Sequence, residues 1–222
     1  MTYTVHEQFY TWQGEGDHMG KAAWFIRLQG CDQKCPWCDA AGTWHPDHKP
    51  DNLERYTPVE LANCVEAPPG AIVVITGGEP CLYDLDPLIG ALAERGYPAH
   101  IETAGHRPLP TRPCWVTLSP KPFATPPLAA NVMRADEFKV IVSGPRSMAD
   151  GLAFTRPGCS TWLHPEWSKH NDQEVLDLIT ETVKDNPDLR AGWQLHKAYR
   201  SDQLDPASRP AVPLGGVSGS PW

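Results

Sequence analysis

The chain has 222 residues, which fits one large domain or at most two small ones. Apolar residues make up 41% of it, enough for a sizeable core, and the formal net charge is -8. An acidic surface repels phosphate backbones, so we expect no nucleic-acid partner. No apolar run approaches the ~20 residues of a membrane span, and residues 1–8 are too polar for a secretory signal. These features predict a cytoplasmic protein with no membrane partner.

Short β-rich runs alternate with helical patterns through the middle of the chain. Gly, Pro or polar residues bound the five clearest runs, at 22–28, 71–76, 99–103, 115–118 and 138–142, and two weaker ones at 161–163 and 192–195. Thr57 and Glu60 form a capping box that begins one helix. Apolar repeats predict two more helices, the first ended by Gly96 and the second by Asn186 with Pro187. This alternation predicts an α/β fold with a parallel sheet, whose site lies at the carboxyl ends of the strands.

The end of the chain has a different composition. Residues 201–222 are rich in Pro, Gly and Ser and show no apolar periodicity. We therefore divide the sequence into a catalytic domain, residues 1–200, and a C-terminal extension, residues 201–222.

The strongest chemical signal is a cysteine loop, Cys31-Asp-Gln-Lys-Cys35-Pro-Trp-Cys38, directly after a predicted strand. Soft thiolates select iron–sulfur clusters, zinc or copper(I). Three thiols on a four-iron cluster leave one iron without a protein ligand, which allows a substrate to bind there. A zinc site wants four protein ligands, and His45 and His48 are the nearest residues that would complete one. A catalytic cluster and a zinc-binding interaction module are the two interpretations.

A second motif, Thr76-Gly77-Gly78-Glu79-Pro80, follows the run at 71–76. Glycines allow backbone to approach a ligand closely, and Glu79 offers an acceptor to an ammonium group. The spacing C-x3-C-x2-C and this Gly-Gly-Glu motif resemble the radical S-adenosylmethionine superfamily. Five further segments narrow the resemblance to the 7-carboxy-7-deazaguanine synthase family: Gln13–Gly16, Arg27–Gly30, Glu102–Gly105, Ser119–Lys121 and Gln194–Lys197.

The resemblance implies a partial (β/α) barrel of the radical S-adenosylmethionine type, reduced in size. It implies radical ring contraction of 6-carboxy-5,6,7,8-tetrahydropterin to 7-carboxy-7-deazaguanine with release of ammonia, a step of queuosine-type biosynthesis. The implied partners are this pterin substrate, an electron donor such as flavodoxin or ferredoxin, and a second copy in a homodimer. A glycyl-radical enzyme activase, which also has a short chain and a three-cysteine loop, is the enzymatic alternative.

The resemblance also assigns site residues. A [4Fe-4S] cluster would be held by Cys31, Cys35 and Cys38. S-adenosylmethionine would be bound by Trp37, Asp39, Gly78, Glu79, Ser119, Pro120, Lys121, His164, Pro165, Glu166 and Trp167. The substrate would be bound by Trp12, Gln13, Gly14, Arg27 and Thr76.

Two positions depart from the family pattern. His164 stands where the family usually has Gln. Ala40 stands where the family has Thr or Ser, whose hydroxyl helps to coordinate a magnesium ion bound to the substrate. Mg2+ can still bind through substrate and waters, so we expect a retained but weaker ion. Lys139 lies outside these motifs and is open to the ordinary interpretation of a solvated charge.

Overall fold

The structure is a computed structural model and describes residues 1–201. A single sheet runs through it in the order β3-β1-β2-β4-β5-β6-β7-β8-β9. Strands β2 and β4 to β9 pair in parallel, whereas β1 pairs antiparallel with both β2 and β3. The sheet is open, with β3 and β9 at its edges. The strands are β1 (Tyr3–Trp12), β2 (Ala22–Leu28), β3 (Glu54–Tyr56), β4 (Ile72–Gly77), β5 (Ala99–Thr103), β6 (Trp115–Leu118), β7 (Glu137–Val142), β8 (Ser160–Pro165) and β9 (Leu189–Ala191).

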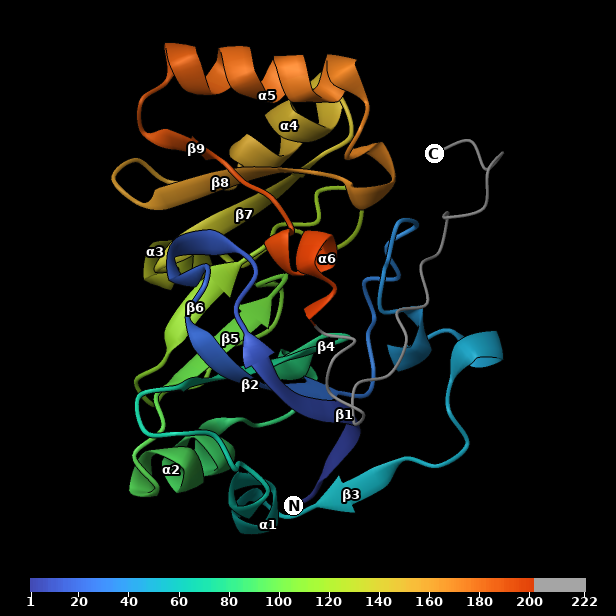
Figure 1. Ribbon diagram of the computed structural model, residues 1–222, viewed down its shortest axis with the longest axis vertical. Coiled ribbons are helices and arrows are strands. Elements are labelled where there is room, and N and C mark those ends of the chain that lie inside the picture. Colours follow the sequence, from blue (N-terminus) through green and yellow to red (C-terminus); the bar gives the residue numbers. More distant parts are fainter. Residues whose placement is uncertain (202–222) are drawn as a thin grey trace.

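Helices cover the outer side of the sheet near its two ends (Figure 1). The helices are α1 (Pro58–Asn63), α2 (Asp86–Glu94), α3 (Ala129–Arg134), α4 (Pro145–Leu152), α5 (Gln173–Asp185) and α6 (Leu195–Tyr199). Short 3-10 helices lie in the connecting loops: η1 (Gly16–His18), η2 (Ala41–Thr43), η3 (Pro46–His48), η4 (Pro80–Leu82) and η5 (Trp167–Lys169). Among the described residues, no helix has the length and apolar character needed to cross a membrane.

The main apolar core lies between the first parallel strands and α1 and α2. Ile26, Ile75 and Ile101 from neighbouring strands are fully buried against Leu88 and Leu92 of α2. Full burial of a side chain of this size contributes about 1.5–3 kcal/mol. A second core packs α4 and α5 onto β7 and β8. The predicted α/β class and the partial, open barrel are therefore confirmed.

The tip of the first hairpin connects the two ends of the open sheet. Asp17, in η1 between β1 and β2, donates its backbone N–H to Glu137 of β7 at 2.7 Å. Its carboxylate accepts from Ser160 and Trp162 of β8 at 2.8 and 2.9 Å, and from Arg190 of β9 at 2.6 Å. Hydrogen bonds from one loop thus tie the hairpin to the last three strands, although no strand pairing closes the barrel.

The five clear strand predictions are confirmed, and so are the capping box at Thr57 and the ends of α2 and α5. The weaker run at 161–163 is the centre of β8. The run at 192–195 is wrong, because β9 ends at Ala191 and Leu195 begins α6. Strand β1 was not predicted from the sequence. The proposed extension, residues 201–222, lies almost wholly outside the described residues.

Candidate active site

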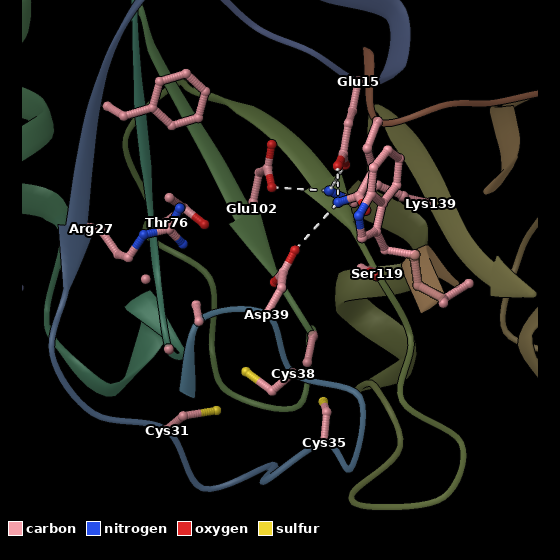
Figure 2. A pocket seen from close by; sticks show the side chains of 18 of the residues that line it. Glu15, Arg27, Cys31, Cys35, Cys38, Asp39, Thr76, Glu102, Ser119 and Lys139 are labelled. Atoms are coloured by element: carbon pink, nitrogen blue, oxygen red, sulfur yellow. Dashed lines mark hydrogen bonds and ion pairs between the residues drawn. The ribbon is translucent and has the colours of Figure 1, made fainter. Parts of the chain in front are cut away.

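A pocket of about 270 Å³ opens at the carboxyl ends of the parallel strands and faces the cysteine loop (Figure 2). It gathers side chains from the N-terminal hairpin, the strand ends and α6. Of the residues expected from the sequence, those that line it are Trp12, Gln13, Arg27, Cys31, Cys35, Trp37, Cys38, Asp39, Thr76, Gly78, Glu79, Ser119, Lys121, Pro165, Glu166 and Trp167. Gly14, Pro120 and His164 are not part of its wall.

The cysteine loop follows β2 directly and turns through Lys34, whose φ of 51° is left-handed. Its three thiols are free and point into one space at the mouth of the pocket (Figure 2). Within residues 1–201, no group of three or more His, Cys, Asp or Glu side chains is arranged around a point where a single metal ion would bind.

The thiols suit a cluster in their chemistry. Burial raises the pKa of Cys35 to about 11, and it also raises the pKa values of Cys31 and Cys38. A bare thiolate is therefore unfavourable here, whereas a coordinated iron deprotonates the thiol and supplies compensating positive charge. Three soft ligands on one short loop fit an iron–sulfur cluster.

Close backbone contacts join the Gly-Gly-Glu motif to the start of this loop. Gly78 N–H donates to Leu28 O at 3.1 Å, and Glu79 N–H donates to Gly30 O at 2.8 Å. A Cβ at residue 78 would lie 2.1 Å from Gly30 O, so only glycine fits. The strand ends of β2 and β4 thus set the cysteine loop and Glu79 side by side.

Glu79 is 2% exposed and firmly held. Its carboxylate accepts from Thr103 Oγ1 at 2.6 Å, Ala104 N at 2.9 Å and Cys81 N at 3.0 Å. A carboxylate has about four lone-pair positions. One acceptor position therefore remains for a cationic donor in the pocket.

Arg27, near the end of β2, extends into the pocket beside Thr76 of β4 (Figure 2). Its Nε donates to the buried Glu7 carboxylate at 2.6 Å. Burial alone would lower the pKa of Arg27, but Glu7 raises it, so the guanidinium stays charged. The Nε bond occupies one of five N–H donors and fixes the plane of the group.

A buried ion cluster, formed by Glu15, Glu102 and Lys139, makes the wall farther from the cysteines (Figure 2). Lys139 is 8% exposed; its Nζ contacts Glu15 and lies 3.0 Å from Glu102 Oε2. Gln13 donates to Glu102 at 2.9 Å, and Gln194 donates to Glu15 at 2.7 Å. Lys139 is therefore not a solvated charge. Both glutamates lie within motifs of the sequence, but no local pattern predicts their pairing with Lys139.

Helix α6 covers this pocket and contacts the cysteine loop. Lys197 Nζ lies 2.6 Å from Asp39 Oδ2 and 4.9 Å from the centre of the Trp167 ring. Burial would raise the pKa of Asp39, but Lys197 lowers it to about 2. Leu195 N–H donates to Gly14 O at 3.1 Å. The segment 192–195, predicted as a last strand, instead leads into this helix, and its Gln194 lines the pocket.

Three expected site residues lie elsewhere. His164 is completely buried, and neither ring nitrogen has a hydrogen-bond partner among residues 1–201. Gly14 packs on His196, where a Cβ would meet Nδ1 at 2.2 Å. Pro120 lines a separate hollow of about 360 Å³ together with Phe123. Lys121, by contrast, reaches the pocket and donates to Ser119 O and Oγ at 2.8 and 2.6 Å.

Comparisons with known proteins identify the family and support the fold. No family model matches the chain. A 7-carboxy-7-deazaguanine synthase from Synechocystis is 41% identical over 200 residues, which cover 89% of this chain and 92% of that protein. One from Flavobacterium psychrophilum is 35% identical and covers 86% and 89%. The crystal structure of QueE from Escherichia coli superposes with a TM-score of 0.75 at 32% identity, covering 88% of this chain and 95% of that one.

The open parallel sheet, with a three-thiol loop and a Gly-Gly-Glu motif at its carboxyl edge, defines a radical S-adenosylmethionine enzyme. The relatives cover most of both chains at more than 30% identity. The chain therefore belongs to the 7-carboxy-7-deazaguanine synthase family. Neither alternative, the glycyl-radical activase or the zinc module, is favoured by these matches.

Proposed function

We propose that this chain catalyses the radical ring contraction of 6-carboxy-5,6,7,8-tetrahydropterin to 7-carboxy-7-deazaguanine with release of ammonia. The observation that carries the proposal is that one pocket holds a three-thiol loop at one end and, away from it, a charged arginine with a buried polar wall. The family relatives carry the name of this activity.

Cys31, Cys35 and Cys38 would hold the [4Fe-4S] cluster. When bound, this cluster and S-adenosylmethionine supply the radical that removes a hydrogen atom from the substrate. The chain's own residues orient the groups. Glu79, held by three donors, accepts from the cofactor's ammonium group, and Lys121 and Ser119 form the opposite side of the cofactor site.

We propose that other residues lining the pocket also contact the cofactor. Trp37 and Asp39 stand beside the cysteines, and Gly78 allows backbone approach. Pro165 is the last residue of β8, Glu166 and Trp167 follow it, and all three line the pocket. For Pro120 and His164, which lie outside the wall, any role acts through their neighbours.

The substrate would lie between Arg27 and the ion cluster. The Arg27 guanidinium suits the substrate carboxylate, because its remaining donors form a planar, charged fork. Trp12, Gln13 and Thr76 line the space between, and Gly14 shapes it by holding α6 close. Carboxylates on the far wall are acceptors, which complement the N–H groups on the aminopyrimidinone edge of a pterin.

A magnesium ion, if used, would bind without a side-chain ligand at residue 40. Ala40 lines the pocket but has no side-chain oxygen, and the nearby Thr43 hydroxyl donates to Ala40 O at 2.7 Å. Asp39 is paired with Lys197. We therefore propose a weakly held Mg2+ carried by substrate and waters, since this ion keeps much of its hydration shell.

Four further proposals remain: the electron donor and the homodimer follow from the family resemblance, and the location and the domain division follow from the composition of the sequence. The electron donor is a small redox protein such as flavodoxin or ferredoxin, the protein works as a homodimer, and it acts in the cytoplasm. The catalytic domain spans residues 1–200, and residues 201–222 form an extension.

The direct test is anaerobic incubation of reconstituted protein with carboxy-tetrahydropterin, S-adenosylmethionine and a reductant, followed by mass analysis. We expect 7-carboxy-7-deazaguanine and ammonia in equal amounts. Iron and sulfide analysis should give a four-iron cluster. Cofactor cleavage without a deazaguanine product would overturn the substrate assignment, and a zinc-only protein would overturn the chemistry.

A further inference from the structure

Residues 103–107 begin with the last residue of β5. This segment contacts both parts of the proposed cofactor site, Glu79 and the cysteine loop. At one end of this 103–107 segment, Thr103 Oγ1 and Ala104 N donate to Glu79 at 2.6 and 2.9 Å. The first part of the site, the proposed acceptor for the cofactor's ammonium group, is therefore oriented by this segment.

The other end of the segment contacts the cysteine loop. His106 Nε2 lies 2.8 Å from Asp32 Oδ1, and Arg107 Nη2 lies 2.6 Å from Asp32 Oδ2. Asp32 is the residue next to Cys31. One short segment thus holds the Glu79 carboxylate and the beginning of the cluster loop at a fixed separation.

The side chain of His106 lies close to both Glu79 and Asp32. Only 3% of it is exposed. Because the Asp32 carboxylate accepts from Arg107 through its other oxygen at 2.6 Å, we assign the hydrogen to His106 Nε2, which then donates to Asp32 Oδ1. The other nitrogen, Nδ1, lies 3.8 Å from Glu79 Oε2 and has no hydrogen-bond partner in the described part of the chain. An unpaired buried acceptor costs free energy, so fold stability alone does not explain the choice of histidine.

The segment itself is rigid. Gly105 turns with φ of 76°, and its N–H donates to Thr103 Oγ1 at 3.0 Å. The Asn131 side-chain amide donates to Gly105 O and Arg107 O, both at 2.7 Å. A rigid segment between two binding groups transmits position from one to the other.

We propose that His106 is a positioning residue, which sets Glu79 relative to the cluster loop and thereby raises affinity for S-adenosylmethionine. The inference rests on the proposed function. A ligand held by an iron on one side and by Glu79 on the other binds best when both groups are preorganised at the right separation. Releasing Asp32 from His106 loosens the loop at its first cysteine and removes that preorganisation.

The test compares His106→Asn with His106→Gln in reconstituted protein. Glutamine places its amide nitrogen near the position of Nε2 and keeps a donor to Asp32, whereas asparagine is too short. We expect His106→Asn to weaken S-adenosylmethionine binding, measured by anaerobic titration calorimetry, about 10- to 100-fold. His106→Gln should restore most of the affinity. Iron and sulfide content and pterin affinity should match the wild type in both variants.

Asp86→Asn is the matched control. Asp86 also accepts from a hydroxyl and a backbone amide, those of Thr111 and Arg112, but it lies at the start of α2. The Asp86→Asn substitution should leave the affinity for S-adenosylmethionine unchanged. Asp32→Asn should weaken S-adenosylmethionine binding as His106→Asn does. This second variant keeps the test valid if His106→Asn folds poorly.

The outcomes separate the two proposals. Wild-type affinity in His106→Asn, or equal losses in the Asn and Gln variants, overturns the positioning role of His106. A reconstituted wild type that does not bind S-adenosylmethionine overturns the proposed function itself.

Discussion

Replacing Lys139 with methionine should destabilise the folded protein strongly and in a pH-dependent way. Lys139 is 8% exposed and pairs with two carboxylates, Glu15 and, at 3.0 Å, Glu102. Removing one partner of a buried ion pair costs about 3–5 kcal/mol, because the remaining charge is left uncompensated. For a chain of this size, each kcal/mol lowers the melting temperature by about 2–4 °C, so Lys139→Met should melt about 6–20 °C lower.

The pH dependence follows from the carboxylates. In the wild type, burial would raise the pKa of Glu15, but Lys139 more than compensates and lowers it. Without Lys139, burial raises the pKa of Glu15 above its unfolded value of about 4.3. The folded variant then binds protons more tightly than the unfolded chain, so its stability deficit is largest near pH 8 and shrinks toward pH 5.

Urea unfolding of the cluster-free protein at pH 5.5 and pH 8 measures both effects. Lys184→Met is the control, because Lys184 pairs with Glu181 on the exposed face of α5 with 63% of its side chain exposed. Such a pair contributes less than about 1 kcal/mol. If Lys139→Met loses no more stability than this control, or loses the same amount at both pH values, the reasoning about a buried, coupled ion cluster is wrong.

Four further outcomes are expected. Cys35→Ala should abolish reductive cleavage of S-adenosylmethionine, measured as methionine release, and full turnover would refute its ligand role. Arg27→Ala should weaken pterin binding by about 1.5–3 kcal/mol, about 10- to 150-fold, while calorimetry shows cofactor binding intact. Ala40→Thr should lower the magnesium concentration for half-maximal rate in chelator-treated enzyme; activity independent of magnesium would point to an ion-free site instead. Burial lowers the pKa of His164 to about 4, so folding stability should fall as pH drops from about 6.5 toward 4, and His164→Gln should reduce that fall in acid unfolding curves.

Much of the sheet could be predicted from the sequence because its strands are buried on both faces. Runs such as the one at 71–76 are short, apolar and bounded by turn residues, so their pattern is unambiguous. Strand β1 gave no such signal. Its polar residues His6 and Glu7 are buried because they line the pocket, and a register shift between Val5 and Glu7 breaks the alternation. A strand whose polar residues line a site lacks the apolar alternation by which strands are predicted from sequence.

Site residues could be predicted where they belong to one short motif. They could not be predicted where the interacting residues are far apart in the sequence. The cysteine loop and Glu79 belong to local motifs, so their spacing is informative. The pairing of Lys139 with Glu15 spans 124 residues, and that of Lys197 with Asp39 spans 158. No local pattern records such pairs. His164 could be assigned by alignment to a family stretch, but only the fold shows that its ring points into the interior.

The loop at Asp17 also has a consequence for how the chain is made. Its partners lie 120 to 173 residues further along, at Glu137, Ser160, Trp162 and Arg190. During synthesis the first hairpin can pair with β4 early, but its tip gains these partners only as β7, β8 and finally β9 emerge. Helix α6, which covers the pocket, emerges later still. Within residues 1–201, the wall that α6 supplies is therefore the last part of the pocket to be synthesised.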